Sequence, residues 1–315
     1  MRIVFMGTPS FAVPSLHALI KEGYQVVAVV SQPDRPKGRK KVLTPPPVKE
    51  AALELGLPVL QPERMRSEDA VAELASYEPD LIVTAAYGQI LPKAVLELPK
   101  HGCINVHGSL LPKYRGGAPI QRSIINGESE TGVTIMYMAE GLDTGDMISS
   151  VVVPIEDEDT AGTMFDKLSL AGAKLLIETI PPLVRGELKA VPQDDSLATY
   201  APNLTREDEK ISWTASAVSI FNQVRGLSPM AGAYTTLNGD VFKVWGCKPI
   251  AAHQNDVQAG TIVSASAEGI VVQTGEGQLL LTMIQPAGKR MMSVSDWIQG
   301  ARAIVGSRFE VEGQA

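Results

Sequence analysis

The chain has 315 residues, which is enough for two domains that each bury a core of their own. Its formal net charge of −7 by itself argues against a nucleic-acid partner, and two cysteines, Cys103 and Cys247, exclude a disulfide framework and a zinc cluster. No apolar run approaches the ~20 residues that span a bilayer, and residues 1–6 are too short for a signal peptide, so we expect a cytoplasmic protein.

The first thirty residues alternate between strand and helix patterns. A short apolar run at residues 2–6 ends at Gly7-Thr8-Pro9, and residues 11–22 then place apolar side chains at helical spacing. A valine-rich run at residues 25–30 predicts a second strand. This order predicts an α/β fold with a Rossmann-like, mostly parallel sheet. Because the motif Gly-x-Gly-x-x-Gly is absent, the pattern does not indicate a dinucleotide site.

Residues 31–47 form a proline-rich insertion that carries a cluster of basic side chains. The five basic residues are Arg35, Lys37, Arg39, Lys40 and Lys41. Most charge runs are simply solvated surface. A connection longer than about 12–15 residues inside a βα unit is often functional, however, so we favour a loop that takes part in binding.

The next elements continue the alternation. Helices are predicted at residues 48–55 and 67–75, and strands at residues 59–61 and 81–85. Residues 87–92 then leave the sheet at the edge where open α/β sheets bind ligands. From the residues alone, a ligand-binding role and an ordinary strand-to-helix turn are about equally supported at 87–92.

The stretch from Cys103 to Asp146 carries the side chains that can perform chemistry. Residues 103–106 predict an apolar strand, at whose carboxyl end Asn105 and His107 share one face. An amide can hold a developing oxyanion, and an imidazole can carry protons near neutral pH. A later carboxylate, Asp143, can orient the imidazole and favour its charged form. These groups are the parts needed to move an acyl group onto an amine.

Asp143 has two rival interpretations. Asp146 follows after two turn residues and could also be the partner of His107. The sequence Asp-Thr-Gly occurs in aspartic proteases as well, where two such carboxylates share a proton. Here it occurs once, in an α/β chain, so we set the protease interpretation aside.

A composition shift divides the chain. Strands at residues 130–138 and 147–153 flank the loop of Asp143, and residues 160–177 predict a long amphipathic helix. Charged and turn residues then dominate residues 187–210, which is typical of an interdomain linker. We therefore predict a catalytic domain at residues 1–189, a linker at 190–206 and a second domain at 207–315.

The second domain is predicted to be a small β-barrel. A helix at residues 215–224 precedes strands at residues 233–237, 241–246, 261–264, 269–273 and 279–283. The pair Asn238-Gly239 is a strong hairpin-turn signal between the first two strands. Several short strands with turn signals in about a hundred residues are typical of a barrel.

The segment Asn105-Val106-His107-Gly108-Ser109-Leu110-Leu111-Pro112, with Gly141-Leu142-Asp143-Thr144-Gly145-Asp146, resembles the signature of the formyltetrahydrofolate-dependent formyltransferases. The match extends to Phe5-Met6-Gly7-Thr8-Pro9, to Arg115-Gly116-Gly117-Ala118-Pro119-Ile120-Gln121-Arg122 and to Ala201-Pro202-Asn203-Leu204. It covers nearly the whole chain. The resemblance implies a C-terminal barrel similar to the oligonucleotide-binding fold, and it favours Asp143 over Asp146.

The resemblance also implies an activity. The protein, which we expect to be a monomer, would transfer the formyl group of 10-formyltetrahydrofolate to the α-amine of methionine on initiator tRNA, for translation initiation and without a metal. Catalysis would depend on Asn105, His107 and Asp143. Folate would be bound by Tyr87, Gly88, Gln89, Ile90, Leu91, Ser109, Leu110, Leu111 and Pro112. The tRNA would be bound by the C-terminal domain and by Arg35, Lys37, Arg39, Lys40 and Lys41.

Two alternatives remain at this point. The acceptor could instead be the amine of a sugar nucleotide, although the basic loop and the 201–204 linker favour tRNA. The chain could also be an inactive RNA-binding module, against which the intact Asn105, His107 and Asp143 argue. Arg115 and Arg122 could contact phosphate or the folate glutamate tail, and packing against a local carboxylate is equally supported for Arg122.

Two positions depart from the family pattern. Lys40 stands where the family usually has a glycine, and Met230-Ala231 stands where it usually has a tryptophan and a proline. The first could stiffen the basic loop, and the second puts one contact of the C-terminal domain in doubt. Neither departure touches Asn105, His107 or Asp143.

Overall fold

The computed structural model describes residues 1–38, 40–251, 257–300 and 304–310, and the chain divides into two compact units. Unit 1 consists of Met1–Pro119, Glu130–Pro154 and Phe165–Pro202. Unit 2 consists of Ile120–Ser129, Ile155–Met164 and Asn203–Ala315. None of the helices in the described part of the chain is long and apolar enough to cross a membrane.

Unit 1 is built on a seven-stranded sheet with the strand order β5-β2-β1-β6-β7-β8-β9. Its strands are β1 (Arg2–Gly7), β2 (Gln25–Val30), β5 (Val59–Leu60), β6 (Leu81–Ala85), β7 (Cys103–His107), β8 (Glu130–Tyr137) and β9 (Met147–Pro154). The pairs from β5 to β7 are parallel, whereas β8 and β9 are added antiparallel. The predicted mostly parallel α/β sheet is therefore confirmed.

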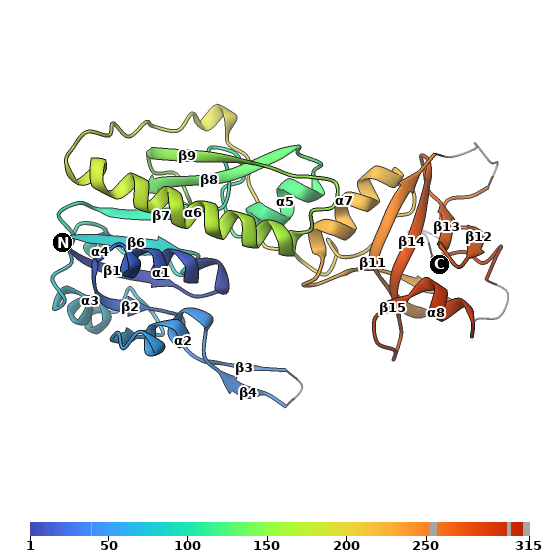
Figure 1. The fold of residues 1–315 in the computed structure, drawn as a ribbon, viewed down its shortest axis with the longest axis horizontal. Helices are drawn as coiled ribbons and strands as arrows, with labels where there is room; N and C mark the ends of the chain where they lie inside the picture. The colour runs from blue at the N-terminus through green and yellow to red at the C-terminus, as the bar shows by residue number, and fades with distance from the viewer. Residues whose placement is uncertain (39, 252–256, 301–303, 311–315) are drawn as a thin grey trace. The chain divides into compact units, whose positions relative to one another are not determined.

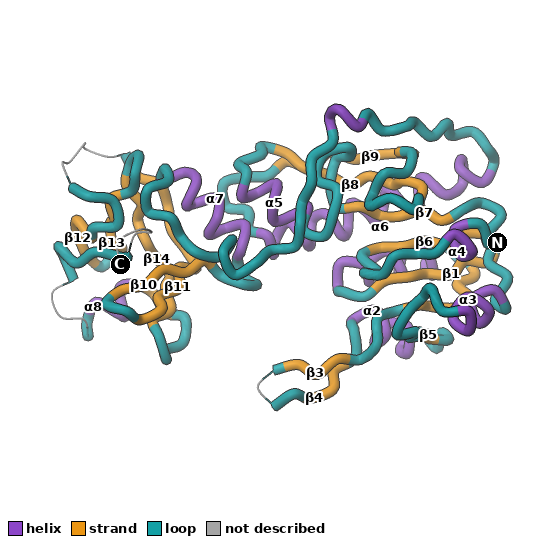
Figure 2. Tube along the Cα trace, turned by 180° about the vertical axis from the view of Figure 1, so that it is seen from behind, coloured by secondary structure: helices purple, strands orange, loops and turns teal. Residues whose placement is uncertain are grey.

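Helices cover both faces of this sheet. They are α1 (Val13–Lys21), α2 (Pro47–Glu54), α3 (Glu68–Ala75), α4 (Lys93–Leu96) and α6 (Ala161–Val184). Helix α5 (Pro119–Ile125) belongs to unit 2 except for its first residue. Leu74 of α3 and Val95 of α4 join one core cluster with Val4 and Ile82 of the sheet. Helices α1 and α6 lie on the opposite face (Figures 1 and 2). There Gly172 of α6 sits so close to β7 that a Cβ would lie 2.8 Å from the Val106 side chain.

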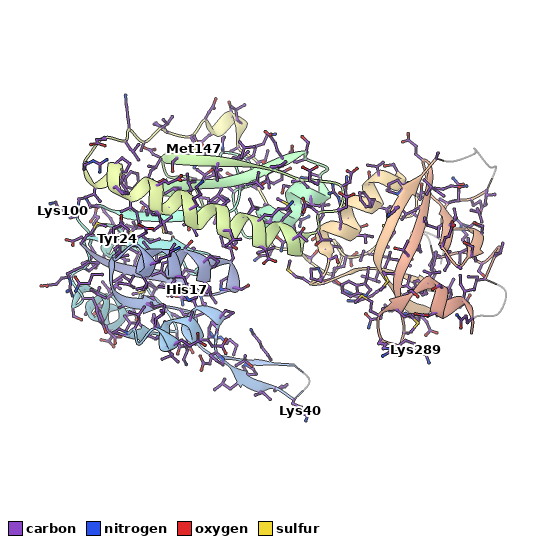
Figure 3. The ribbon with its side chains drawn as sticks, in the orientation of Figure 1. His17, Tyr24, Lys40, Lys100, Met147 and Lys289 are labelled. Carbon is purple, nitrogen blue, oxygen red and sulfur yellow. The ribbon has the colours of Figure 1, made fainter. Side chains whose placement is uncertain are left out.

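The insertion at residues 31–47 is a hairpin rather than the expected loop. Strands β3 (Arg35–Lys37) and β4 (Val42–Thr44) pair antiparallel and form a two-stranded sheet of their own. The turn between them uses left-handed backbone at Gly38 and Lys41, where φ is +71° and +49°. Lys40 lies at its tip (Figure 3). Arg39, one of the predicted tRNA contacts, lies outside the described residues.

Unit 2 contains helix α7 (Ala217–Leu227) and a six-stranded antiparallel sheet. The strands are β10 (Ala233–Leu237), β11 (Asp240–Ile250), β12 (Ile262–Ser266), β13 (Gly269–Gln273), β14 (Gln278–Pro286) and β15 (Met292–Ser293), and helix α8 spans Val294–Ile298. Trp213 and Phe309 stack in its core with their ring centroids 5.1 Å apart.

The segment 306–310 closes this sheet into a barrel. The Ile262 amide of β12 donates to the Ser307 carbonyl, and the Glu310 amide donates to the Thr236 carbonyl of β10. The segment thus bridges the two outermost strands of the sheet, β12 and β10. The predicted barrel is confirmed, and two of its strands, β11 and β14, run past the predicted ends at 246 and 283.

Candidate active site

Polar groups gather where the parallel strands of unit 1 end. Thr8 follows β1, Gln32 follows β2, Tyr87 follows β6, and His107 is the last residue of β7. The Thr8 hydroxyl and the Gln32 side-chain amide both donate to the Tyr87 carbonyl, at 2.8 Å and 3.3 Å. Hydrogen bonds therefore join the loops at the carboxyl edge of the sheet, which is where open α/β sheets bind ligands.

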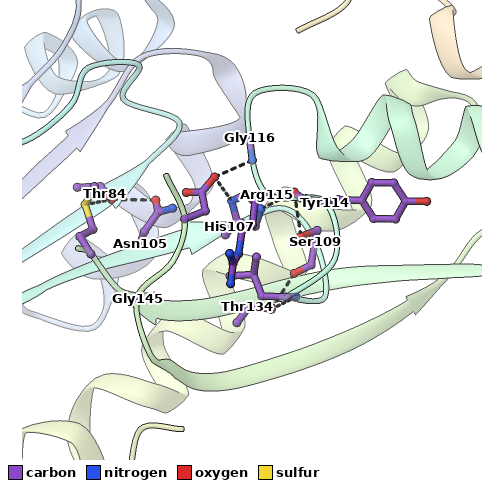
Figure 4. Close-up of polar contacts among 12 residues, drawn as sticks. Thr84, Asn105, His107, Ser109, Tyr114, Arg115, Gly116, Thr134 and Gly145 are labelled. Carbon is purple, nitrogen blue, oxygen red and sulfur yellow. Dashed lines mark hydrogen bonds and ion pairs between the residues drawn. The ribbon is translucent and has the colours of Figure 1, made fainter. Parts of the chain in front are cut away.

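Asn105 is held by the neighbouring strand. Thr84 of β6 lies opposite Asn105 of β7 in the parallel register. Its hydroxyl donates to Asn105 Oδ1 at 2.8 Å (Figure 4). Because the carbonyl end of the amide is fixed in this way, the Nδ2 group of Asn105 is left as the donor for a ligand.

His107 is almost fully buried, with 6% of its surface exposed. Its Nε2 lies 3.0 Å from the Tyr114 carbonyl (Figure 4). A carbonyl can only accept, so Nε2 carries the proton and donates. The other ring nitrogen, Nδ1, faces the Asp143 carboxylate at 3.7 Å from Oδ2. This distance is longer than a hydrogen bond, and the two groups form an ion pair only when the ring is protonated.

Asp143 is held in place by backbone contacts. Its φ of +51° is left-handed, a conformation that aspartate tolerates better than most residues. Its Oδ2 accepts from the Gly116 amide at 2.8 Å. Gly116 has to be glycine, because its φ is +122° and a Cβ there would lie 2.7 Å from the Ala201 carbonyl oxygen. The rival carboxylate, Asp146, is exposed.

Gln193 steadies the loop of Asp143 from a distant part of the sequence. Its side-chain amide donates to the carbonyls of Asp143 and Gly145 at 2.7 Å and 2.8 Å. Its Oε1 accepts from Arg115 Nε at 3.0 Å. Sequence reasoning missed Gln193, because it lies in the segment interpreted as a linker. Thr84 was also missed, although a polar residue near the carboxyl end of an apolar strand is a usable signal.

The two arginines of the motif at residues 115–122 form ion pairs with carboxylates of this chain. Arg115 is 2% exposed and donates to Asp195 Oδ1 at 2.7 Å, so its guanidinium is buried instead of facing a phosphate or a glutamate tail. Arg122 donates from both Nη atoms to the Asp208 carboxylate, at 2.6 Å and 3.0 Å. This pair lowers the pKa of Asp208 to about 2. For Arg122 the structure supports the packing interpretation.

The side chains of the segment 87–91 point in different directions. Tyr87 and Leu91 are buried in the core of unit 1, and burial raises the pKa of the Tyr87 hydroxyl to about 12. Gln89 donates to the Pro62 carbonyl and accepts from the Met65 amide, at 3.1 Å and 2.7 Å. Ile90 is 81% exposed, and Gly88 has a φ of +87°. Of the predicted folate contacts here, Gly88 and Ile90 are exposed and Gln89 is half-buried.

The segment 109–112 is tied to β8. Thr134 of β8 accepts from the Leu111 amide at 3.1 Å and donates to the Ser109 carbonyl at 2.7 Å. The Ser109 hydroxyl is buried and donates to the Lys113 carbonyl at 2.7 Å. The side chains of Leu110 and Pro112 are half-buried, whereas Leu111 is buried. This loop follows His107 directly and forms one wall beside it.

The basic side chains lie on the separate β3–β4 hairpin. Lys37, Lys40 and Lys41 are exposed, and Arg35 donates to Glu63 at 3.0 Å. No group of three or more His, Cys, Asp or Glu side chains that could hold a metal ion occurs among the described residues.

Comparison with known proteins identifies relatives of both parts of the chain. Residues 1–180 match the family described as formyl transferase, and residues 203–302 match the formyl transferase C-terminal domain. The methionyl-tRNA formyltransferase of Bacillus subtilis strain 168 is 56% identical over 314 residues, which is 99% of each chain. That of Halalkalibacterium halodurans is 57% identical over 302 residues, 96% of this chain and 95% of the relative.

Solved structures share the fold at lower identity. The N-formyltransferase of Helicobacter canadensis, in complex with folinic acid and dTDP-3-aminofucose, has a TM-score of 0.65 and 20% identity, and covers 90% of this chain and 98% of its own. HypX from Aquifex aeolicus, in complex with tetrahydrofolic acid, has a TM-score of 0.64 and 17% identity, and covers 95% of this chain and 47% of its own.

Proposed function

This chain belongs to the formyl transferase family, and we propose that it transfers the formyl group of 10-formyltetrahydrofolate to the α-amine of methionine esterified to initiator tRNA. The observation that carries this proposal is the juxtaposition of Asn105, His107 and Asp143 at the carboxyl end of β7. An amide donor, a proton carrier and an orienting carboxylate are what acyl transfer to an amine requires.

Asn105 supplies the oxyanion donor. When the α-amine attacks the formyl carbon, the carbonyl oxygen gains negative charge, and Nδ2 of Asn105 donates to it. One well-placed donor of this kind stabilises the transition state by about 3–4 kcal/mol. The Thr84 hydroxyl keeps the amide in the orientation that this role needs.

His107 moves the proton. As the new C–N bond forms, the attacking nitrogen loses a proton, and the folate nitrogen needs one when its bond to the formyl carbon breaks. Nδ1 can take up the first proton and deliver the second, because Nε2 is engaged with the Tyr114 carbonyl. Asp143 beside Nδ1 stabilises the protonated ring during the transfer. The attacking amine, with an ordinary pKa near ~8, is partly neutral without help.

Folate and tRNA are assigned to different surfaces of the chain. For folate we propose the backbone of Gly88, the side chain of Ile90 and the wall at residues 109–112. For tRNA we propose the exposed lysines of the β3–β4 hairpin together with unit 2. The predicted domain boundaries and the monomeric state stay predictions.

One face of the unit 2 barrel supports a nucleic-acid role. The Arg206 guanidinium lies 3.7 Å from the centre of the Tyr234 ring, and Lys243 Nζ lies 5.3 Å from that of Trp245. Tyr234 and Lys243 are neighbours across β10 and β11. Aromatic rings interleaved with cations are typical of surfaces that bind single-stranded nucleic acid, although here Arg206 also pairs with Glu209 and Lys243 donates to the Ala231 carbonyl.

A direct assay tests the acceptor. The full-length chain is incubated with 10-formyltetrahydrofolate and either methionyl initiator tRNA or a dTDP-linked aminosugar, and formylated product is measured by mass spectrometry. We expect formylmethionyl-tRNA and no formylated sugar. Formyl transfer to the sugar alone would favour the alternative, which the solved structures at 20% identity do not establish.

A further inference from the structure

The β3–β4 hairpin is separate from the main sheet of unit 1. Its strands pair with each other in a two-stranded sheet, and all of their residues except Thr44 are exposed. A hairpin of this kind is only marginally stable alone in water. Its orientation therefore depends on the groups that hold its two ends.

One carboxylate holds both ends. Asp34 directly precedes β3, and Lys49 lies in the first turn of α2, after β4 and the stiff connection Pro45-Pro46-Pro47. Lys49 Nζ donates to Asp34 Oδ1 and Oδ2 at 2.9 Å and 2.8 Å. The two side chains are only 20% and 24% exposed, so this pair is better shielded from solvent than an ordinary surface salt bridge.

Gln61 ties the same carboxylate to the main sheet. Its Nε2 donates to Asp34 Oδ1 at 2.7 Å and to the Gln32 carbonyl at 3.0 Å. Gln32 follows β2 and is itself bonded to the Tyr87 carbonyl. The hydrogen bond from Gln61, followed by that from Lys49, lowers the pKa of Asp34, so the carboxylate stays ionised at neutral pH.

We propose that Asp34 is a positioning residue for the tRNA substrate: through Lys49 and Gln61 it fixes the direction in which the basic hairpin leaves the sheet edge. The inference rests on the proposed function, because it assigns the hairpin to tRNA. A carboxylate at the base of a cationic arm opposes the binding of a polyanion by its charge. A carboxylate at this position makes sense if orienting the hairpin favours tRNA binding by more than the negative charge of Asp34 opposes it.

The charge effect and the positioning effect of Asp34 change KM for tRNA in opposite directions, so a substitution of Asp34 distinguishes them. Asp34→Asn removes one negative charge from the hairpin region and should strengthen tRNA binding if charge alone matters. If Asp34 positions the arm, KM for methionyl-tRNA should rise about tenfold, because the arm must then be ordered as it binds. We expect kcat and KM for folate to stay within about twofold, because the variant touches neither Asn105 nor His107.

Glu63→Gln is the matched control. Glu63 is also an acid beside the hairpin, where it pairs with Arg35, but this pair is 71% and 58% exposed and lies outside the Asp34 contacts. The control changes the charge by the same amount, and we expect KM for tRNA to be unchanged or lower. Lys49→Met combined with Asp34→Asn should be no worse than Asp34→Asn alone, because Asp34→Asn already removes the ion pair with Lys49.

Hydrogen exchange gives a readout that does not depend on activity. The amides of β3 and β4 should exchange faster in Asp34→Asn than in wild type and Glu63→Gln, and Gln61→Leu should behave like Asp34→Asn. An unchanged or lowered KM for tRNA in Asp34→Asn, or unchanged exchange in both Asp34→Asn and Gln61→Leu, would overturn the inference. Failure of the wild-type chain to formylate methionyl-tRNA would instead refute the proposed function.

Discussion

Asp143→Asn isolates the contribution of the carboxylate to proton transfer. Asparagine has the same shape, tolerates the left-handed φ of +51° at this position, and can still accept from the Gly116 amide. The substitution therefore removes a charge with little effect on the backbone. In the wild-type chain the carboxylate oxygen lies 3.7 Å from His107 Nδ1, and both side chains are mostly buried.

The size of the effect follows from that distance. Two opposite charges about 4 Å apart interact by roughly 4 kcal/mol at the effective dielectric constant of a partly buried site. If this stabilisation of the protonated ring acts mainly in the transition state, kcat should fall by about a thousandfold. KM for both substrates should change little.

The assay is single-turnover formylation of methionyl-tRNA with 10-formyltetrahydrofolate, with thermal unfolding as a check on the fold. Asp146→Asn is the control, because Asp146 lies in the same loop but its side chain is exposed. We expect this control to keep wild-type turnover. A larger loss in Asp146→Asn than in Asp143→Asn would refute the assignment of the carboxylate.

Three further predictions concern the proton carrier, the hairpin and unit 2. His107→Asn should lower kcat at least about a hundredfold with the fold intact, because it removes the proton carrier. Alanine at residues 39–41 should raise KM for tRNA and lower the slope of its salt dependence by about 0.7–0.9 for each phosphate that the variant no longer neutralises. Arg122→Ala should lower the free energy of unfolding at pH 7 by about 1–2 kcal/mol, measured by urea titration, because the pKa of Asp208 lies near 2 in the folded chain and near 3.8 ordinarily.

Each of these has a contradicting outcome. Wild-type turnover in His107→Asn would remove the histidine from the mechanism. A change in folate KM with an unchanged tRNA KM would assign residues 39–41 to the folate site. For Arg122→Ala, the depressed pKa of Asp208 means that its contribution is complete above about pH 4 and disappears as pH falls towards about 2. A difference from wild type that persisted undiminished at the acid end of this range would show that the ion pair is not its cause.

The alternation of side chains along buried strands is enough to predict that Asn105 and His107 lie together at the carboxyl end of β7, at the centre of the proposed site. Asn105 and His107 share a face of β7 because successive residues of a strand point to opposite sides, and no tertiary information is needed for that step. Their place at the sheet edge follows from the parallel pairing of β6 and β7, which the βαβ pattern predicts. Thr84 could have been found by the same reasoning.

The β3–β4 hairpin could not be predicted in this way. Sequence patterns indicate strands mainly through the burial of alternate residues, and β3 and β4 are exposed on almost every residue. Short strands with Pro36 and lysines resemble a solvated loop in composition. The end of β11 was missed for a different reason, because a bulge around Gly246 interrupts its pairing with β14 and looks like a strand end in the sequence.

The segment interpreted as a linker shows why part of the site required the structure. Residues 190–206 have the composition of a flexible connection, yet part of this segment is hydrogen-bonded to Arg115, in the loop that follows β7. The Arg115 amide donates to the Thr199 carbonyl at 2.8 Å, and the Ala201 amide donates to the Arg115 carbonyl at 2.7 Å. Such hydrogen bonds join residues that are far apart in the sequence and leave no periodic pattern in it.

These hydrogen bonds make the position of Asp143 depend on the 193–201 segment. The buried Arg115 orients Gln193, and Gln193 in turn holds the carbonyls on either side of the turn that carries the Asp143 carboxylate. The same segment supplies the Ala201 carbonyl that packs against Gly116, whose amide binds that carboxylate directly. A polar segment with the composition of a linker therefore helps to fix the distance between Asp143 and His107, on which the proposed proton transfer depends.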